Sequence, residues 1–140
     1  LRKVKLYDVS YEIDGEKYRG LFSFALITNA NRVAGINNFY KDIKLDDNKF
    51  EILLCNITKL KDIVKTLYFF ALYDASKIPG FYFYKADNIK IRFNSSLKKP
   101  LCIDGESFDD MSGNYNIKID HDVYVLMPSK NINNLFCNKD

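Results

Sequence analysis

Apolar and polar residues alternate over residues 3–13, which predicts that the chain begins with a β-strand. The apolar positions change parity near Tyr7-Asp8, and such a change indicates a β-bulge or a bend. Asp14-Gly15 follows as a two-residue turn, and residues 16–28 are predicted to form the returning strand. Residues 21–27 are apolar at both parities, as expected for a strand whose two faces are covered.

The middle of the chain changes from the period of a strand to that of a helix. Residues 29–38 are rich in Asn and small side chains and predict a loop. Residues 44–49 predict a polar turn, and residues 50–55 predict a further strand. Over residues 56–73, apolar side chains recur at helical spacing with lysines opposite them, which predicts an amphipathic helix. Such a helix usually packs on the core, and the alternative is that it lies on a membrane surface.

The last third of the chain predicts two hairpins and one short strand. The first hairpin pairs residues 81–85 with residues 89–93, and the second pairs residues 115–119 with residues 123–127. Between the hairpins, the apolar residues 101–103 lead into another Asp-Gly turn.

About eight antiparallel strands and one inserted helix favour a mainly β fold, arranged as a two-layer antiparallel β-sandwich. We expect this β-sandwich domain to span residues 1–128 and to be followed by a polar tail at residues 129–140. The chain has 140 residues, of which 47% are hydrophobic and 15% aromatic, so one domain can bury a sizeable core.

Charge and cysteine content exclude several classes of protein. The net charge of +3 permits contact with an acidic membrane surface or nucleic acid but indicates neither. The aromatic residues do not interleave with Lys and Arg as in RNA-binding sheets. Three cysteines without a CxxC pair disfavour a disulfide framework or a zinc site and favour a reducing cytosol. No apolar run reaches the roughly 20 residues that span a bilayer. We therefore expect a cytoplasmic protein, and the absence of an initiator Met predicts a fragment of a longer chain.

Two carboxylates flank one glycine in the sequence Ile103-Asp104-Gly105-Glu106. A turn of this kind presents both acids together, and either could act as a general base. The same tetrapeptide occurs at residues 13–16, and Asp-Gly is among the commonest hairpin turns. A purely structural role therefore also explains both copies. His121 is the only histidine, and the scattered glycines form no phosphate-binding loop.

The acidic turn at Asp46-Asp47 is a second candidate site. A carboxylate surrounded by backbone carbonyls can bind a hard cation such as Mg²⁺. Two acids in a turn are more often simply solvated, so the turn alone indicates a metal only weakly.

The order of these segments is more specific than any one of them. An apolar strand ends at Thr28-Asn29-Ala30, the turn at residues 44–50 and the helix follow, and residues 85–91 precede Asp104-Gly105-Glu106. From about Tyr11 to Met127 this order resembles the C-terminal domain of the diacylglycerol kinase family, particularly the bacterial soluble lipid kinases. In that family a TNA-type strand is followed by a Gly-rich loop, then by an LDDG turn, a helix and a DGE turn.

The resemblance implies a fold, a reaction and a set of site residues. It implies a β-sandwich in which Glu106 is the base that deprotonates a lipid alcohol, with Asp104 as the alternative. It also implies a structural Mg²⁺ bound by the Asp47 side chain and by the backbone carbonyls of Lys44 and Lys49. ATP and the catalytic Mg²⁺ would bind to a nucleotide-binding domain outside this chain, so the fragment alone is expected to be inactive.

The same resemblance implies a phospholipid-metabolising kinase that works at the periphery of the membrane, and it allows a homodimer. It does not fix the lipid, because diacylglycerol, a sphingoid base and other lipid alcohols all fit. The chain departs from the family pattern at Asn48, which replaces the LDDG glycine, and at Ala34-Gly35, to which the Gly-rich loop is reduced. Asn tolerates the left-handed conformation, so the turn can form. The alternative function is a non-catalytic β-sandwich binding module in which both acidic turns are only turns.

Overall fold

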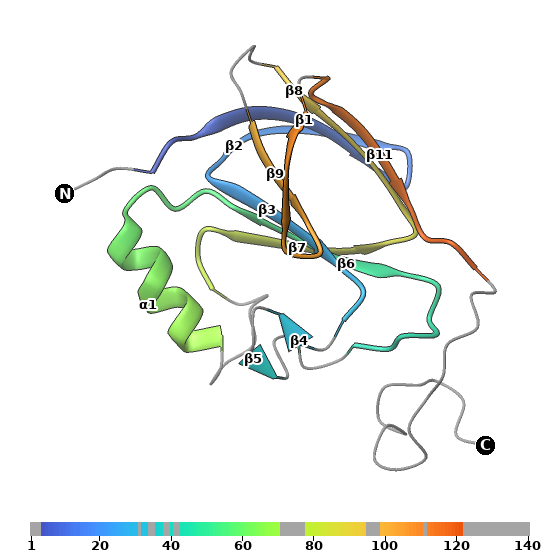
Figure 1. The fold of residues 1–140 in the computed structure, drawn as a ribbon, viewed down its shortest axis with the longest axis horizontal. Coiled ribbons are helices and arrows are strands. Elements are labelled where there is room, and N and C mark those ends of the chain that lie inside the picture. Colours follow the sequence, from blue (N-terminus) through green and yellow to red (C-terminus); the bar gives the residue numbers. More distant parts are fainter. Residues whose placement is uncertain are drawn as a thin grey trace.

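The structure is a computed structural model that describes residues 4–30, 32–33, 36–37, 40, 43–70, 78–94, 99–110 and 112–121. Within these residues the chain forms eleven strands and one helix (Figure 1). The strands are β1 (Tyr7–Ile13), β2 (Glu16–Phe22), β3 (Phe24–Thr28), β4 (Arg32–Val33), β5 (Ile36–Asn37), β6 (Phe50–Cys55), β7 (Phe81–Ala86), β8 (Asn88–Phe93), β9 (Lys99–Ile103), β10 (Glu106–Asp110) and β11 (Asn114–Lys118), and the helix is α1 (Leu60–Phe70).

Two antiparallel sheets face each other and form the body of the molecule (Figure 1). One sheet has the strand order β11-β8-β1-β2, and the other has the order β3-β6-β7. The hairpins β4–β5 and β9–β10 form separate two-stranded sheets. The predicted mainly β fold, an antiparallel β-sandwich with one inserted helix, is confirmed.

The core between the two sheets is built from side chains at alternate strand positions. In β1, every second residue from Val9 to Ile13 is buried, as expected for a strand with one covered face. Burial of each large apolar side chain favours folding by about 1.5–3 kcal/mol. The core residues are Val9, Tyr11, Ile13, Phe22, Phe50, Ile52, Leu54, Ala86, Ile89 and Ile91.

β6 is buried along its whole length because both of its faces are covered. Phe50, Ile52 and Leu54 face the core between the sheets. Leu53 and Cys55 point to the other side, where they pack against Tyr40, Ile43 and Phe81. Glu51 has the same parity as Leu53, so a carboxylate is buried on this second face.

The predicted single strand over residues 16–28 is wrong, because it is two strands in different sheets. The chain leaves the four-stranded sheet after β2 and enters the three-stranded sheet as β3. At Ser23, between the strands, the backbone N–H donates to the Cys55 carbonyl at 2.6 Å, and the side-chain hydroxyl donates to the same oxygen at 3.0 Å. The apolar run therefore marks a crossing between two layers rather than one interior strand.

The predicted hairpin of residues 81–85 with residues 89–93 is also wrong. Both strands exist, but β7 pairs with β6, whereas β8 pairs with β1 and β11. Only Asp87 separates them, which is too short for a hairpin loop and suits a second crossing between the sheets. The expected partner strand at residues 123–127 and the expected tail lie outside the described residues, so the predicted domain bounds stay predictions.

The predicted helix is present as α1, Leu60–Phe70, and it begins later than predicted. Residues 71–73 of the prediction lie outside the described residues. Leu60 is 53% exposed and Val64 is 59% exposed, so the expectation that they pack on the core is wrong. No helix within the described part of the chain combines the length and apolar character that crossing a bilayer requires.

Candidate functional site

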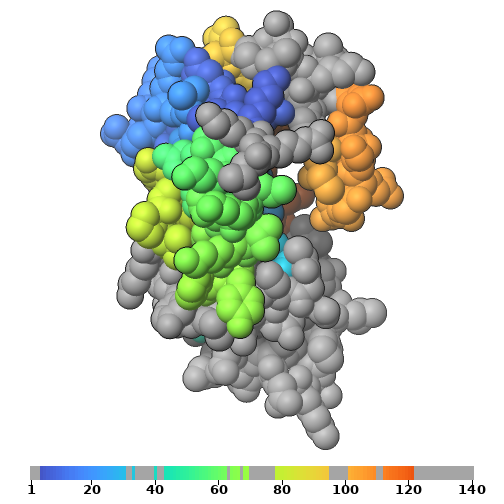
Figure 2. Space-filling view, turned by 90° about the vertical axis from the view of Figure 1, so that its left-hand side faces the viewer, coloured from blue at the N-terminus to red at the C-terminus, as the bar shows by residue number. Residues whose placement is uncertain are grey.

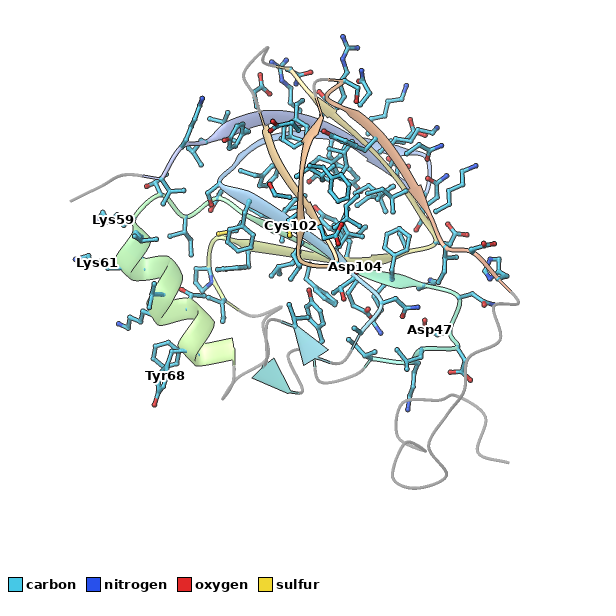
Figure 3. The ribbon with its side chains drawn as sticks, viewed as in Figure 1. Asp47, Lys59, Lys61, Tyr68, Cys102 and Asp104 are labelled. Atoms are coloured by element: carbon cyan, nitrogen blue, oxygen red, sulfur yellow. The ribbon has the colours of Figure 1, made fainter. Side chains whose placement is uncertain are left out.

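The second acidic turn is present, as predicted, and it joins β9 to β10, a returning strand that the sequence did not predict. Ile103 pairs with Glu106, so Asp104 and Gly105 are the two loop residues. Their φ angles are 50° and 90°, and two positive φ angles in a row are typical of a type I′ turn. Figure 3 shows Asp104 at the end of the hairpin, away from the helix.

Both candidate bases are open to solvent. Asp104 and Glu106 are exposed and form no hydrogen bond or ion pair with any residue that the structure describes. A general base must reach the proton that it removes, and an uncommitted carboxylate at the end of a hairpin meets that requirement.

The first acidic turn has the same local geometry. Asp14 has a φ angle of 50° and Gly15 has one of 84°, and this turn joins β1 to β2. Local sequence therefore fixes the same backbone conformation twice, and it does not by itself distinguish the two copies. Their positions differ, because the first turn ends two strands of the sandwich and the second ends a separate hairpin.

The hairpin β9–β10 stands off from the rest of the molecule. Figure 2 shows it on the right-hand side, with a hollow between it and α1. Ile103 and Phe108 are 51% and 42% exposed on its strands. A two-stranded hairpin with little cover is only marginally stable, so these side chains suit contact with a ligand or another part of a longer protein.

The predicted metal-binding turn also has the expected backbone. Asn48 has a φ angle of 57°, which confirms that it adopts the left-handed conformation in place of glycine. The Lys49 backbone N–H donates to Asp47 Oδ1 at 3.1 Å. His121 Nδ1 lies 3.2 Å from Asn48 Oδ1, so it holds the turn from a distant part of the chain.

Two residues that the sequence did not single out join Asp47 in a charged cluster. Lys85 Nζ lies 3.7 Å from Asp47 Oδ2 and 3.5 Å from Glu51 Oε1. Glu51 is fully buried, and burial raises the pKa of its carboxyl above the ordinary value while Lys85 opposes that shift. The alternation of residues 50–55 could have found Glu51, because it places an acid on a face shared with Leu53 and Cys55.

Of the charged cluster formed by Asp47, Glu51 and Lys85, only the Asp47 carboxylate is suited to binding Mg²⁺. Asp47 offers a carboxylate in a turn, and Mg²⁺ commonly takes one or two carboxylates and keeps several waters. Lys44 and Lys49, whose carbonyls are the other predicted ligands, flank that turn. The described residues contain no group of three or more His, Cys, Asp or Glu side chains that could hold a metal. A metal here would therefore depend on backbone oxygens and would compete with Lys85 for Asp47.

The structure does not bring the predicted catalytic and metal residues together. Figure 3 shows Asp47 well to one side of Asp104, and no hydrogen bond or ion pair given for the described residues links the two turns. The candidate base and the candidate metal turn are thus two separate features of one domain.

Comparisons with known proteins agree with the predicted resemblance. No protein-family model matches the sequence. A protein of Staphylococcus saprophyticus named diacylglycerol kinase is 26% identical over 132 residues, which cover 94% of this chain and 43% of that protein. A Staphylococcus aureus protein of the same name is 24% identical over 140 residues, which cover 100% of this chain and 44% of the relative.

Solved structures show the same fold. A crystal structure described as a diacylglycerol kinase from Bacillus anthracis matches with a TM-score of 0.62 and 22% identity, over 82% of this chain and 38% of that one. A second structure from that organism, described as a putative diacylglycerol kinase, matches with a TM-score of 0.61 over 84% of this chain. The resemblance to diacylglycerol kinases is confirmed, and this chain spans less than half the length of the curated relatives that it matches.

Proposed function

We propose that this chain is the part of a diacylglycerol-kinase-like lipid kinase that receives the lipid alcohol, and that Glu106 is its general base. The observation that carries the proposal is the similarity to curated diacylglycerol kinases over 94% of the chain. The exposed position of the carboxylate on the β9–β10 hairpin supports it. Because the relatives are more than twice as long, the nucleotide site is assigned to another part of the natural protein.

The proposed reaction transfers the γ-phosphoryl group of ATP to the lipid. The lipid hydroxyl oxygen forms a bond to the γ-phosphorus, and the bond from that phosphorus to the β,γ-bridging oxygen breaks to release ADP. Glu106 accepts the hydroxyl proton, and Asp104 is the alternative acceptor. General base catalysis of this kind contributes about 10²–10⁴-fold to the rate, and the rest depends on positioning and on charge stabilisation of the phosphoryl group.

We assign the structural Mg²⁺ to the turn that contains Asp47, with carbonyl oxygens from Lys44 and Lys49. A bound cation would supply charge that stabilises this turn, rather than chemistry at the lipid. Lys85 already places a positive charge 3.7 Å from Asp47, so the metal is expected to bind weakly and to strengthen the turn by a modest amount.

A kinase assay on the natural full-length protein that contains this chain tests the proposal. With Mg²⁺-ATP and diacylglycerol in mixed micelles, we expect phosphate transfer to the lipid, and a sphingoid base in parallel reports the choice of lipid. The 140-residue chain alone is expected to transfer none. If the full-length protein phosphorylates no lipid alcohol, the proposed function is wrong.

The alternative is a non-catalytic β-sandwich binding module. The identical conformation of the two acidic turns favours it, because turn formation alone explains both. Lipid binding by the full-length protein without any phosphate transfer would be the result expected of such a module.

A further inference from the structure

The outward face of α1 carries apolar side chains that the protein does not cover. Leu60, Val64 and Tyr68 are 53%, 59% and 69% exposed. They are spaced four residues apart, so they form one stripe along the helix. A surface helix that packs on a core normally turns its apolar stripe inward and its polar side outward.

Among the helix residues whose side chains the structure describes, the most buried one is polar. Thr66 is only 8% exposed, and its hydroxyl donates to the Asp62 carbonyl at 2.6 Å. Asp62, one turn earlier, is half-buried. Among the described side chains of α1, a hydroxyl is buried and an acid is half-buried, whereas the stripe is exposed to solvent.

Lysines border the exposed stripe. Lys59, Lys61 and Lys65 are all exposed, whereas Asp62, half-buried, is the only acid of the helix. Lys65 Nζ lies 5.8 Å from the centre of the Phe69 ring. Figure 3 shows Lys59 and Lys61 projecting to the left of the helix and Tyr68 projecting below it, all away from the sheets. The outward face is thus apolar and positively charged, with a tyrosine of the kind that anchors proteins at membrane interfaces.

We propose that this outward face of α1, formed by Leu60, Val64 and Tyr68 with Lys61 and Lys65, docks on an anionic phospholipid bilayer. The apolar side chains enter the boundary between headgroups and acyl chains, and the ammonium groups meet the anionic headgroups. Charge complementarity selects this occupant. Interfaces between proteins are depleted in lysine, which disfavours a second copy or another domain as the partner of this face.

The docking surface and the candidate base lie on different elements of the molecule. Figure 2 views the molecule from the side to which the helix faces, with the hairpin β9–β10 at the edge of that view, beyond the hollow. Figure 1 shows this hairpin set back from α1, toward the middle of the molecule. This inference uses the proposed lipid kinase function only to explain why docking is useful, and the docking itself is tested without ATP.

Sedimentation with vesicles tests the docking on the natural full-length protein. The probe is large unilamellar vesicles of phosphatidylcholine with about 30% phosphatidylglycerol, compared with pure phosphatidylcholine. We expect binding to the anionic vesicles that weakens with salt. Combined Leu60→Ser, Val64→Ser and Tyr68→Ser substitutions are expected to reduce the partition coefficient at least about tenfold, because they remove the apolar area that enters the bilayer.

Two further variants separate apolar from electrostatic docking. Lys61→Gln with Lys65→Gln should weaken binding to anionic vesicles and reduce its dependence on salt, because two headgroup contacts are lost. Leu21→Ser is the matched control, since Leu21 is 55% exposed on β2 and lies on a different element. It should bind vesicles like the unsubstituted protein, and all variants should keep the same thermal midpoint within about 3 °C.

The inference is overturned if the triple variant binds vesicles as tightly as the unsubstituted protein. It is also overturned if the substitutions convert a dimer to a monomer with no change in vesicle binding, because the face would then join two copies. Turnover of a short-chain, monomeric diacylglycerol distinguishes this result from failure of the kinase proposal. Docking variants should keep that turnover and lose activity only toward lipid in bilayers.

Discussion

At the scale of single residues, Glu51 is the described carboxylate whose burial is complete. It is fully buried on the central strand, and Lys85 is the cation 3.5 Å away that offsets its charge. Removal of one partner from a buried ion pair leaves an uncompensated charge, which typically costs about 3–5 kcal/mol. Lys85 also faces Asp47, so it connects the buried strand to the acidic turn.

Lys85→Met is therefore expected to lower the free energy of unfolding by about 3–5 kcal/mol near neutral pH, measured by urea denaturation. Lys90→Met is the matched control. Lys90 pairs with Glu12 at 2.7 Å, but its side chain is 55% exposed, and such surface pairs contribute about 1 kcal/mol or less. Equal losses in the two variants would contradict the structural role of Glu51 and Lys85.

The loss in Lys85→Met should also depend on pH. Burial raises the pKa of Glu51 above its ordinary value of 4.5, so the folded state binds a proton more readily than the unfolded state. The free energy of unfolding of the variant therefore increases as the pH falls, and it decreases as the pH rises through the raised pKa of Glu51. Lys85 opposes that rise in pKa, so its removal raises the folded-state pKa of Glu51 further. The deficit relative to the unsubstituted protein should therefore shrink as the pH falls toward the ordinary value of 4.5, as read from urea unfolding curves at several pH values. A deficit that grows on acidification would show that another group is responsible.

At the scale of elements, the sequence pattern predicted those features that depend only on neighbouring residues. The strand at residues 50–55 and both Asp-Gly turns were predicted correctly, because alternation and positive φ angles are local properties. The pairing of β7 and β8 with different sheets could not be predicted in this way, since it depends on which distant strand is available. The apolar run around Ser23 was ambiguous for the same reason.

The turn at Asn48 depends on a residue that tolerates the left-handed conformation. Asn48→Ala should destabilise the protein by about 1–2 kcal/mol, because alanine lacks the short polar side chain that lets Asn tolerate a φ angle of 57°. Asn48→Gly is the control, since it also loses the contact with His121 but removes the strain. Thermal unfolding of the two variants measures the difference. If the alanine variant is as stable as the glycine variant, the left-handed conformation of this turn is wrong.

At the scale of the whole molecule, the sandwich holds two candidate sites on separate elements. The resemblance to lipid kinases was predicted from the order of motifs, and the likeness to solved structures agrees with it. The charged cluster could not be predicted, because Asp47 and Lys85 are far apart in the sequence and meet only when β6 and β7 pair. The exposure of the α1 stripe also depends on the tertiary arrangement rather than on helical period.

Metal removal tests the second of these sites. We expect Mg²⁺ to raise the thermal midpoint of the full-length protein, because a ligand that binds only the folded state stabilises it. Asp47→Ala should abolish the part of this rise that arises at the turn, whereas Asp14→Ala, in the first acidic turn, should leave it unchanged. Differential scanning fluorimetry with Mg²⁺ and with a chelator measures both. Equal responses to Mg²⁺ in all three proteins would place no metal at Asp47.

One of two identical tetrapeptides supplies the proposed catalytic base, and the other copy serves as its control. Glu16 and Glu106 follow turns with the same backbone conformation, and both are exposed. The most direct measurement is lipid phosphorylation by the full-length protein carrying either Glu106→Gln or Glu16→Gln, with circular dichroism to verify the fold. We predict that Glu106→Gln lowers kcat by about 10²–10⁴-fold, whereas Glu16→Gln changes it less than about twofold. Near-normal turnover by a folded Glu106→Gln variant would contradict the claim.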